Sequence, residues 1–222
     1  MKARKFTLIE LLMVIAVILV LASLLLPSFN RARALSKRVV CLSSMKQLGM
    51  MVQNFAINNK GLLPRTESPS NFGEECTWYS STGFRGLAHM RDYCDRDSFN
   101  RLFRCPMVKS GPWANFDIQN PGQGPLQYRG YNAEGQMRLS DGAQAIIADY
   151  FSSGFYTRQW YVDRGFKDIA HNIRGCAGYG VVYKDGHGRL QNDPTRAISQ
   201  MAPLNTYNAG SEGAWTYFDA NP

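Results

Sequence analysis

The sequence has few histidines and none of the short motifs that mark common active sites. It contains three histidines in 222 residues, at His89, His171 and His187. It lacks a G-x-S-x-G nucleophile elbow, a phosphate-binding glycine loop, an H-E-x-x-H pair and a dinucleotide-binding fingerprint. The five cysteines include no C-x-x-C pair, which argues against a structural zinc site. We therefore expect a protein that is not an enzyme and that needs no cofactor.

Acidic residues are scarce in the first part of the chain. Residues 1–65 carry ten lysines and arginines and a single acid, Glu10, whereas residues 66–222 carry 15 basic and 16 acidic residues. The formal net charge of +8 thus comes from the N-terminal quarter. Because the remainder is nearly neutral, the basic pI of about 9.4 does not indicate a nucleic-acid-binding domain.

A long apolar run lies close to the N-terminus. Residues 11–26 contain Ser23 as their only polar residue. Together with residues 6–9 they give about 21 positions, or roughly 31 Å of helix, which is long enough to cross a bilayer with Glu10 near one end. We expect a membrane-spanning helix over residues 6–26. A cleaved secretory signal fits less well, because no clean small-x-small cleavage site follows the run.

Residues 27–60 show the pattern of an amphipathic helix, which Gly61 and Pro64 are expected to end. Basic residues occupy the faces outside its apolar stripe. The stripe recurs at spacings of three and four and consists of Leu35, Val39, Leu42, Met45, Leu48, Val52 and Phe55. Such a stripe predicts a helix that packs against its own domain.

The start of the apolar run carries a resemblance to a known family. Its residues Lys5-Phe6-Thr7-Leu8-Ile9-Glu10-Leu11-Leu12 resemble the processing signal of type IV prepilins and type II secretion pseudopilins. The resemblance implies that a prepilin peptidase removes residues 1–5 as a leader and methylates the new amino terminus at Phe6. It also implies that Glu10 pairs with the Phe6 amine of a neighbouring subunit, so that two charges costly in lipid neutralise each other. The family usually has Gly or Ala before the cut, where this chain has Lys5.

The resemblance also implies a fold and a cellular role. The expected class is α+β, with a long pilin-type helix, bent at Pro27, packed on a globular antiparallel β-sheet domain of residues 61–222. Members are structural subunits of a type II secretion pseudopilus or a type IV pilus-like filament. Their partners are the peptidase, other subunits in a helical assembly and an inner-membrane assembly platform.

The same resemblance places the N-terminus in the cytoplasm and the head in the periplasm or, after assembly, outside the cell. Basic residues flank the span on both sides, so the positive-inside rule does not choose between the two orientations. The alternative is an uncleaved single-pass anchor that carries an extracytoplasmic binding or hydrolytic domain. The unusual Lys5 favours that alternative.

The head sequence predicts short elements separated by many turn residues. We expect one or two helices within residues 84–103 and a hairpin turn at Asp185-Gly186, because glycine accepts a positive φ. Strands are expected at 126–131, 143–149, 159–162, 179–184 and 189–191. The aromatic tail predicts a strand or a cap on the core, and consists of Trp215, Tyr217 and Phe218.

Short fragments of the head extend the resemblance to an environmental group of prepilin-like proteins described by an H-x9-DG motif. Here His171 precedes Asp185 at a spacing of H-x13-DG. If Asp149, Asp185 and His187 converge with His171, they could hold calcium, although calcium prefers six to eight oxygens. The alternative is that these residues serve turns and hydrogen bonds.

Export, which the resemblance implies, favours disulfides in the head. The expectation is two bridges, with three pairings open, among Cys76, Cys94, Cys105 and Cys176. Cys41 lies on the helix stripe and is then expected to be a buried thiol. The alternative is five free thiols.

Overall fold

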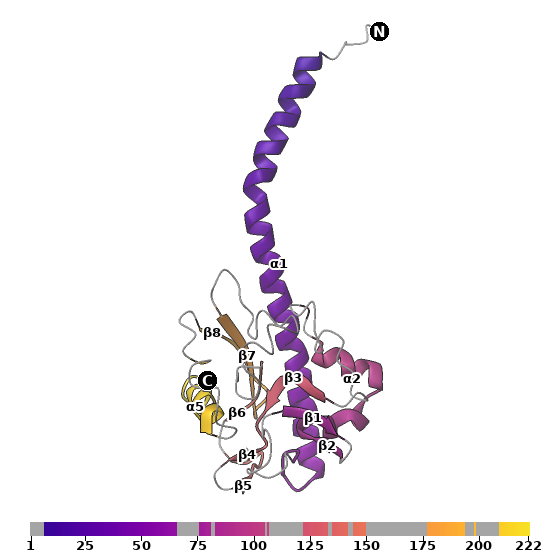
Figure 1. Cartoon of the computed structure of the whole chain (residues 1–222), viewed down its shortest axis with the longest axis vertical. Coiled ribbons are helices and arrows are strands. Elements are labelled where there is room, and N and C mark those ends of the chain that lie inside the picture. The colour runs from indigo at the N-terminus through magenta and orange to yellow at the C-terminus, as the bar shows by residue number, and fades with distance from the viewer. Residues whose placement is uncertain are drawn as a thin grey trace. The chain divides into compact units, whose positions relative to one another are not determined.

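Figure 1 shows the structure, which is a computed structural model of the chain. It describes residues 7–65, 76–80, 83–104, 106, 122–132, 135–141, 144–149, 177–193, 198 and 209–222. The chain forms two compact units, Met1–Ser36 and Lys37–Pro222.

The described part of the first unit is the beginning of one long helix. This helix, α1, runs over Leu8–Asn58 and continues through Pro27, which lacks the backbone N–H that would donate to the carbonyl four residues earlier (Figure 1). Ser23 Oγ and Ser28 Oγ each donate to the carbonyl three residues before them, at 2.7 and 2.8 Å. Both hydroxyls therefore find an acceptor within the helix itself, which suits a segment surrounded by lipid.

The second unit is built on an antiparallel sheet of six strands in the order β2-β1-β3-β6-β7-β8. These strands are β1 (Cys76–Ser80), β2 (Gly83–Arg85), β3 (Gly122–Tyr128), β6 (Ala145–Asp149), β7 (Ala177–Tyr183) and β8 (Gly188–Asp193). A separate two-stranded ladder joins β4 (Tyr131–Asn132) and β5 (Gly135–Gln136).

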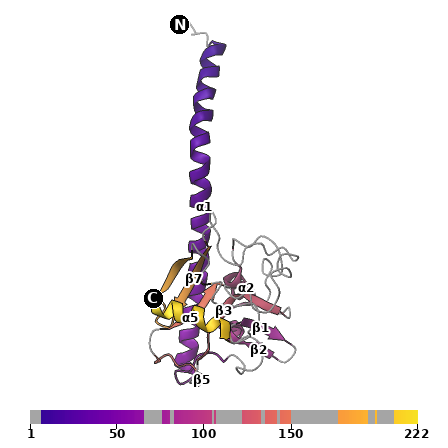
Figure 2. The ribbon, with the colours of Figure 1, turned by 60° about the vertical axis from the view of Figure 1, so that its left-hand side comes forward.

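Within the described residues, three helices besides α1 accompany the sheet. They are the 3₁₀ helix η1 (Gly86–Tyr93), α2 (Arg96–Phe103) and α5 (Ala209–Ala220). Asp95 caps α2, because its carboxylate accepts a 2.9 Å bond from the backbone N–H of Ser98. Helix η1 lies against β1 and β2, and α2 lies against β3. Figure 2 shows α5 beside β7.

Residues 37–58 of α1 pack on one face of the sheet, where glycines let helix and strand approach closely. A Cβ on Gly49 of the helix would lie 2.8 Å from Cγ1 of Val182 in β7. A Cβ on Gly180 of β7 would lie 2.9 Å from Sδ of Met45. Real Cβ atoms essentially never come that close to a neighbour, so these positions have room only for glycine unless the packing shifts.

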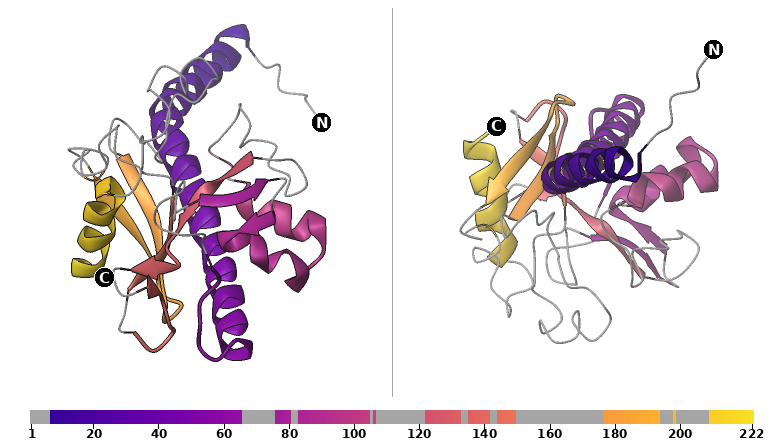
Figure 3. Two further views of the ribbon diagram at one scale, coloured as in Figure 1. Left: turned by 60° about the horizontal axis from the view of Figure 1, so that its bottom comes forward. Right: turned by 90° about the horizontal axis from the view of Figure 1, so that it is seen from above.

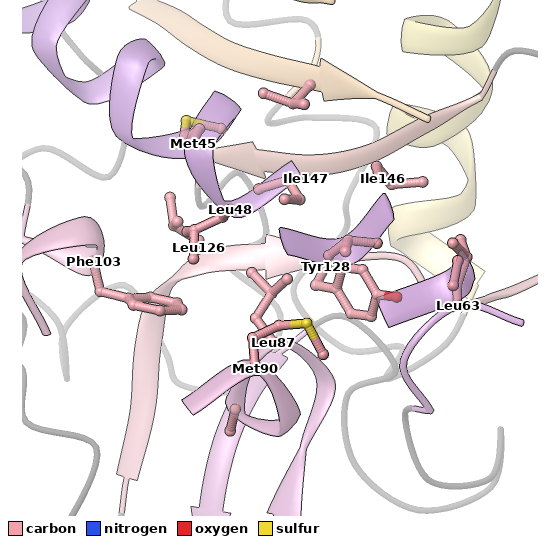
Figure 4. Packing of buried hydrophobic residues seen from close by; sticks show 14 of the residues in the cluster. Met45, Leu48, Leu63, Leu87, Met90, Phe103, Leu126, Tyr128, Ile146 and Ile147 are labelled. Atoms are coloured by element: carbon pink, nitrogen blue, oxygen red, sulfur yellow. The ribbon is translucent and has the colours of Figure 1, made fainter. Parts of the chain in front are cut away.

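The main hydrophobic core lies under this part of α1 (Figure 4). Leu48, Val52 and Ala56 of the helix have no exposed surface. They pack in one cluster with residues of η1, α2, β3 and β6, among them Leu87, Met90, Phe103, Leu126, Tyr128, Ile146 and Ile147. The later part of the predicted amphipathic stripe, from Leu42 to Phe55, therefore packs on its own domain, whereas Leu35 and Val39 are 44% and 59% exposed.

The opposite face of the sheet is covered by α5. Trp215 and Phe218 of α5 are buried in a second cluster with Tyr179, Val181 and Tyr183 of β7. Figure 3 shows β7 and β8 lying between α5 and the second half of α1. Alternate residues of β7 thus serve two different cores, which is the period of two that a strand imposes.

The expected α+β class, with a long helix packed on an antiparallel sheet, is confirmed. The predictions at 126–131, 143–149, 179–184 and 189–191 correspond to β3, β6, β7 and β8. The strand predicted at 159–162 lies outside the described residues. The aromatic tail caps the core as expected, but it does so as a helix and not as a strand. Strands β1, β2 and β5 were not predicted.

Candidate functional site

The first turn of α1 is closed by a reciprocal capping arrangement. Thr7 precedes the helix, and its hydroxyl accepts a 3.3 Å bond from the backbone N–H of Glu10. In return, Glu10 Oε2 accepts bonds from the Thr7 backbone N–H at 2.8 Å and from the Thr7 hydroxyl at 2.7 Å. This is the capping box, in which two backbone N–H groups without a helical partner are each satisfied by the other residue's side chain.

The capping role of Glu10 was not predicted, although the sequence carries its signal. A Ser or Thr followed three residues later by Glu, directly before an apolar run, is the usual sequence pattern of the motif. Thr7 and Glu10 fit it. Lys5 and Phe6, the other residues of the processing signal, lie outside the described residues.

The helix that follows this cap presents an apolar surface. All described residues from Thr7 to Arg33 are exposed, and large side chains such as Leu8, Leu19 and Leu24 are 79%, 67% and 71% exposed. Its most apolar 18-residue window has a mean hydropathy of 3.0 and no buried residue. By length and composition α1 is therefore compatible with a single transmembrane span.

The Asp-Gly turn between β7 and β8 holds a local Asp–His pair. Asp185 Oδ1 accepts from the His187 backbone N–H at 3.0 Å and lies 2.6 Å from Nδ1 of the same residue. The His187 ring stacks on Tyr183 at 4.1 Å between centroids. Burial raises the pKa of Asp185, but the hydrogen bonds from His187 outweigh burial, so this pKa lies below its ordinary value. Gly186 sits in the turn at φ 87°, as the sequence predicted.

Asp149 bonds to strand β7. Its carboxylate is buried and accepts a 2.5 Å bond from the backbone N–H of Gly180 in β7. Asp185 and His187 are about half exposed on their turn, while His171 lies outside the described residues. Among the described residues, no three His, Cys, Asp or Glu side chains form a group that could hold a metal ion.

Two cysteines have described side chains, and neither forms a disulfide. Cys41 is buried on the helix stripe, as expected. Cys94 is also free, which differs from the disulfide expected at this position. Burial raises the pKa of the Cys94 thiol, and the nearby Asp95 carboxylate adds to the shift. The side chain of Cys76 and the whole of Cys105 and Cys176 lie outside the described part of the chain.

Cys94 lines a groove of about 590 Å³ in the head. Met50 and Met51 of α1 form one side of this groove, and Tyr93 and Leu102 contribute to the other. Among the described residues, Arg101 is the one charged side chain that lines it. The groove surface is therefore mainly apolar, with three uncharged polar residues in its lining, Gln47, Asn54 and Ser98.

Fold and site together define a class: an α+β protein whose capped N-terminal helix is compatible with one membrane span and whose second half packs on an antiparallel sheet. No family model, curated protein or solved structure matches the chain.

Proposed function

We propose that this chain is a structural subunit of a type II secretion pseudopilus or a type IV pilus-like filament, processed by a prepilin peptidase. One observation carries the proposal. The residues that resemble the processing signal, Thr7 and Glu10 among them, are the residues that start and cap a long, exposed, apolar helix. A subunit that is first held in a membrane and then joins a filament needs a long apolar helix that begins at the processing site.

In this proposal Glu10 has two successive partners. In the single subunit its carboxylate is bonded by the backbone N–H and hydroxyl of Thr7. These local bonds lower the cost of holding a carboxylate near the edge of the hydrocarbon, because a polar group without any partner there is costly. During assembly the positively charged Phe6 amine of a neighbouring subunit becomes the partner and sets the stagger between subunits. Repetition of the same head-to-tail contact then produces a helical filament.

The placement in the cell follows from the same proposal. The subunit is anchored in the inner membrane by the first part of α1, with its N-terminus in the cytoplasm. The head, on the periplasmic side, packs on residues 37–58 of the helix and decorates the filament surface. The protein's work is then mechanical, and no catalytic residue, cofactor or metal ion is required for it.

Two observations favour a second candidate, an uncleaved anchor with an extracytoplasmic binding domain. The first is Lys5 at the position where the family usually has Gly or Ala. The second is the apolar groove of about 590 Å³ beside Cys94, which is large enough for a small ligand.

The intact mass and N-terminal sequence of the protein from native membranes separate the two candidates. The filament proposal predicts a chain that begins at methylated Phe6. A chain that still begins at Met1, in membranes where the same peptidase processes another substrate, contradicts it. Lys5→Gly is the matched variant: if it is cleaved while the natural chain is not, Lys5 blocks processing, and the anchored domain becomes the better account.

A further inference from the structure

Two arginines follow the apolar run of α1. Arg31 and Arg33 are the first charged residues after Glu10, and both are exposed. All three lie in the first unit. Within the described part of the chain, neither guanidinium has an ion-pair partner, and the next acid along the sequence after Glu10 is Glu67. Two exposed cations directly after an apolar run are placed where an anionic headgroup layer would attract them.

The spacing of these charges matches a bilayer. Arg31 follows Glu10 by about 21 residues, which corresponds to roughly 32 Å along a helix, close to the hydrocarbon thickness of about 30 Å. Arg33 lies about 3 Å further along the axis. When Glu10 is at one boundary of the hydrocarbon, both guanidinium groups therefore reach the headgroup layer of the other leaflet. Their long apolar stems allow them to adjust to the phosphates.

We propose that Arg31 and Arg33 bind the phosphates of anionic phospholipids at this boundary. A guanidinium presents a fork of donors that matches two phosphate oxygens, and the pair is charge-assisted. The two side chains leave the helix about 200° apart, since each residue turns it by about 100°. They therefore contact different lipids on opposite sides of the span. The proposal rests on the membrane span alone and does not need the filament.

The experiment uses the full chain in nanodiscs that contain phosphatidylcholine and phosphatidylglycerol, two lipids that differ in headgroup charge. Native mass spectrometry counts the lipids that stay bound to the released protein. The natural chain is expected to retain phosphatidylglycerol in preference to phosphatidylcholine. Each juxtamembrane arginine is worth about 1 kcal/mol toward anionic lipid, so R31Q/R33Q is expected to lose about fivefold in preference per arginine.

Two matched variants test whether charge at this position is the cause. R31K/R33K keeps both charges and is expected to retain most of the preference. K60Q removes an exposed cation in the turn that follows α1 and is expected to behave like the natural chain. Equal retention of both lipids by the natural chain, an unchanged preference in R31Q/R33Q, or an equal loss in K60Q would each overturn the proposal. None of these results depends on whether the chain is cleaved before Phe6, so failure here is distinct from failure of the proposed function.

Discussion

The two halves of α1 use apolar side chains in opposite ways. In residues 8–26 nearly every position is apolar and exposed, including Leu19 at 67%. In residues 37–58 the apolar positions form a stripe, and Leu48 and Val52 have no exposed surface. The second half packs on its own sheet, whereas the first half has an apolar surface all round the helix that no described residue covers. By length and composition the first half is compatible with a transmembrane span.

Removal of the negative charge of Glu10 is expected to have the largest effect. In the filament proposal, Glu10→Gln keeps the capping box, because Gln serves in that motif as well as Glu. It removes the charge that pairs with a neighbouring amine, so membrane insertion is expected to persist while incorporation into filaments is lost. The measurement compares the amount of protein in sheared filaments with the amount in membranes.

Thr7→Ala is the control for that experiment. It removes the hydroxyl that bonds Glu10 but leaves the carboxylate charged. Incorporation is expected to persist in Thr7→Ala, with fraying of the first helical turn visible as faster amide exchange at residues 8–10. Normal incorporation of Glu10→Gln would contradict the proposed pairing.

A second test contrasts two leucines of the same helix. Leu48→Ala is expected to lower the free energy of unfolding of the head by about 2–5 kcal/mol, because it leaves a cavity in a closely packed core. Leu19→Ala should change that value by less than about 0.5 kcal/mol, since the side chain is exposed in the first half. Denaturant unfolding of both variants in the same detergent, followed by near-UV circular dichroism, measures the difference. A similar loss in both variants would mean that the two halves are not distinct.

A third test concerns the close contact of Gly49 with Val182. In an exposed helix interior, Gly→Ala stabilises by about 1 kcal/mol. At Gly49 the new Cβ would meet Cγ1 of Val182 at 2.8 Å, and overpacking of this kind costs about 1–3 kcal/mol. We expect Gly49→Ala to destabilise the head by about 1 kcal/mol in the natural background and to become stabilising in a Val182→Ala background. A rise in melting temperature for the single variant would show that the helix can shift.

The smallest expected effect is a pH dependence from Asp185. Its folded pKa lies below the ordinary value of 3.8, because the hydrogen bonds from His187 outweigh burial. A carboxyl whose pKa is lowered by folding contributes stability above its unfolded pKa, and that stability is lost as the pH falls below about 4. The side chain is 55% exposed, so we expect only about 0.2–0.5 kcal/mol after solvent screening. Asp185→Asn should remove this part of the change in urea midpoint between pH 6 and pH 3, and an identical acid limb in both proteins would contradict it.

Local patterns predicted much of the fold. The apolar run, the stripe of residues 35–55 and the Asp-Gly turn each depend on periodicity or on one dipeptide, and α1, β7 and β8 follow them. Strands β1 and β2 escaped prediction because both are short; β1 also depends on pairing with β3, far along the chain, while β2 pairs with β1 at the edge of the sheet. The tail was predicted to be a strand or a cap on the core, and only the cap is confirmed. The buried pair, Trp215 and Phe218, instead has the spacing of three that a helix gives.

The candidate site was also predicted only in part. The resemblance drew attention to Glu10 as a residue of assembly, and its local role as a helix cap was overlooked although Thr7, three residues earlier, completes the capping pattern in the sequence. Cys94 was assigned to a disulfide from compartment and cysteine number alone. Its free thiol depends on which residues surround it after folding, and spacing in the sequence does not give that information.

The alternation along β7 also bears on how accurately the head can fold. Gly178, Gly180 and Val182 face α1, while Tyr179, Val181 and Tyr183 face α5. A slip of one residue in strand pairing would turn two tyrosines toward a helix that leaves room for little more than hydrogen. In a pairing shifted by one residue, the tyrosines of β7 would overlap with α1, so the core could not pack. The glycines of β7 thus favour the native register of the strand, in addition to allowing the close contact with α1.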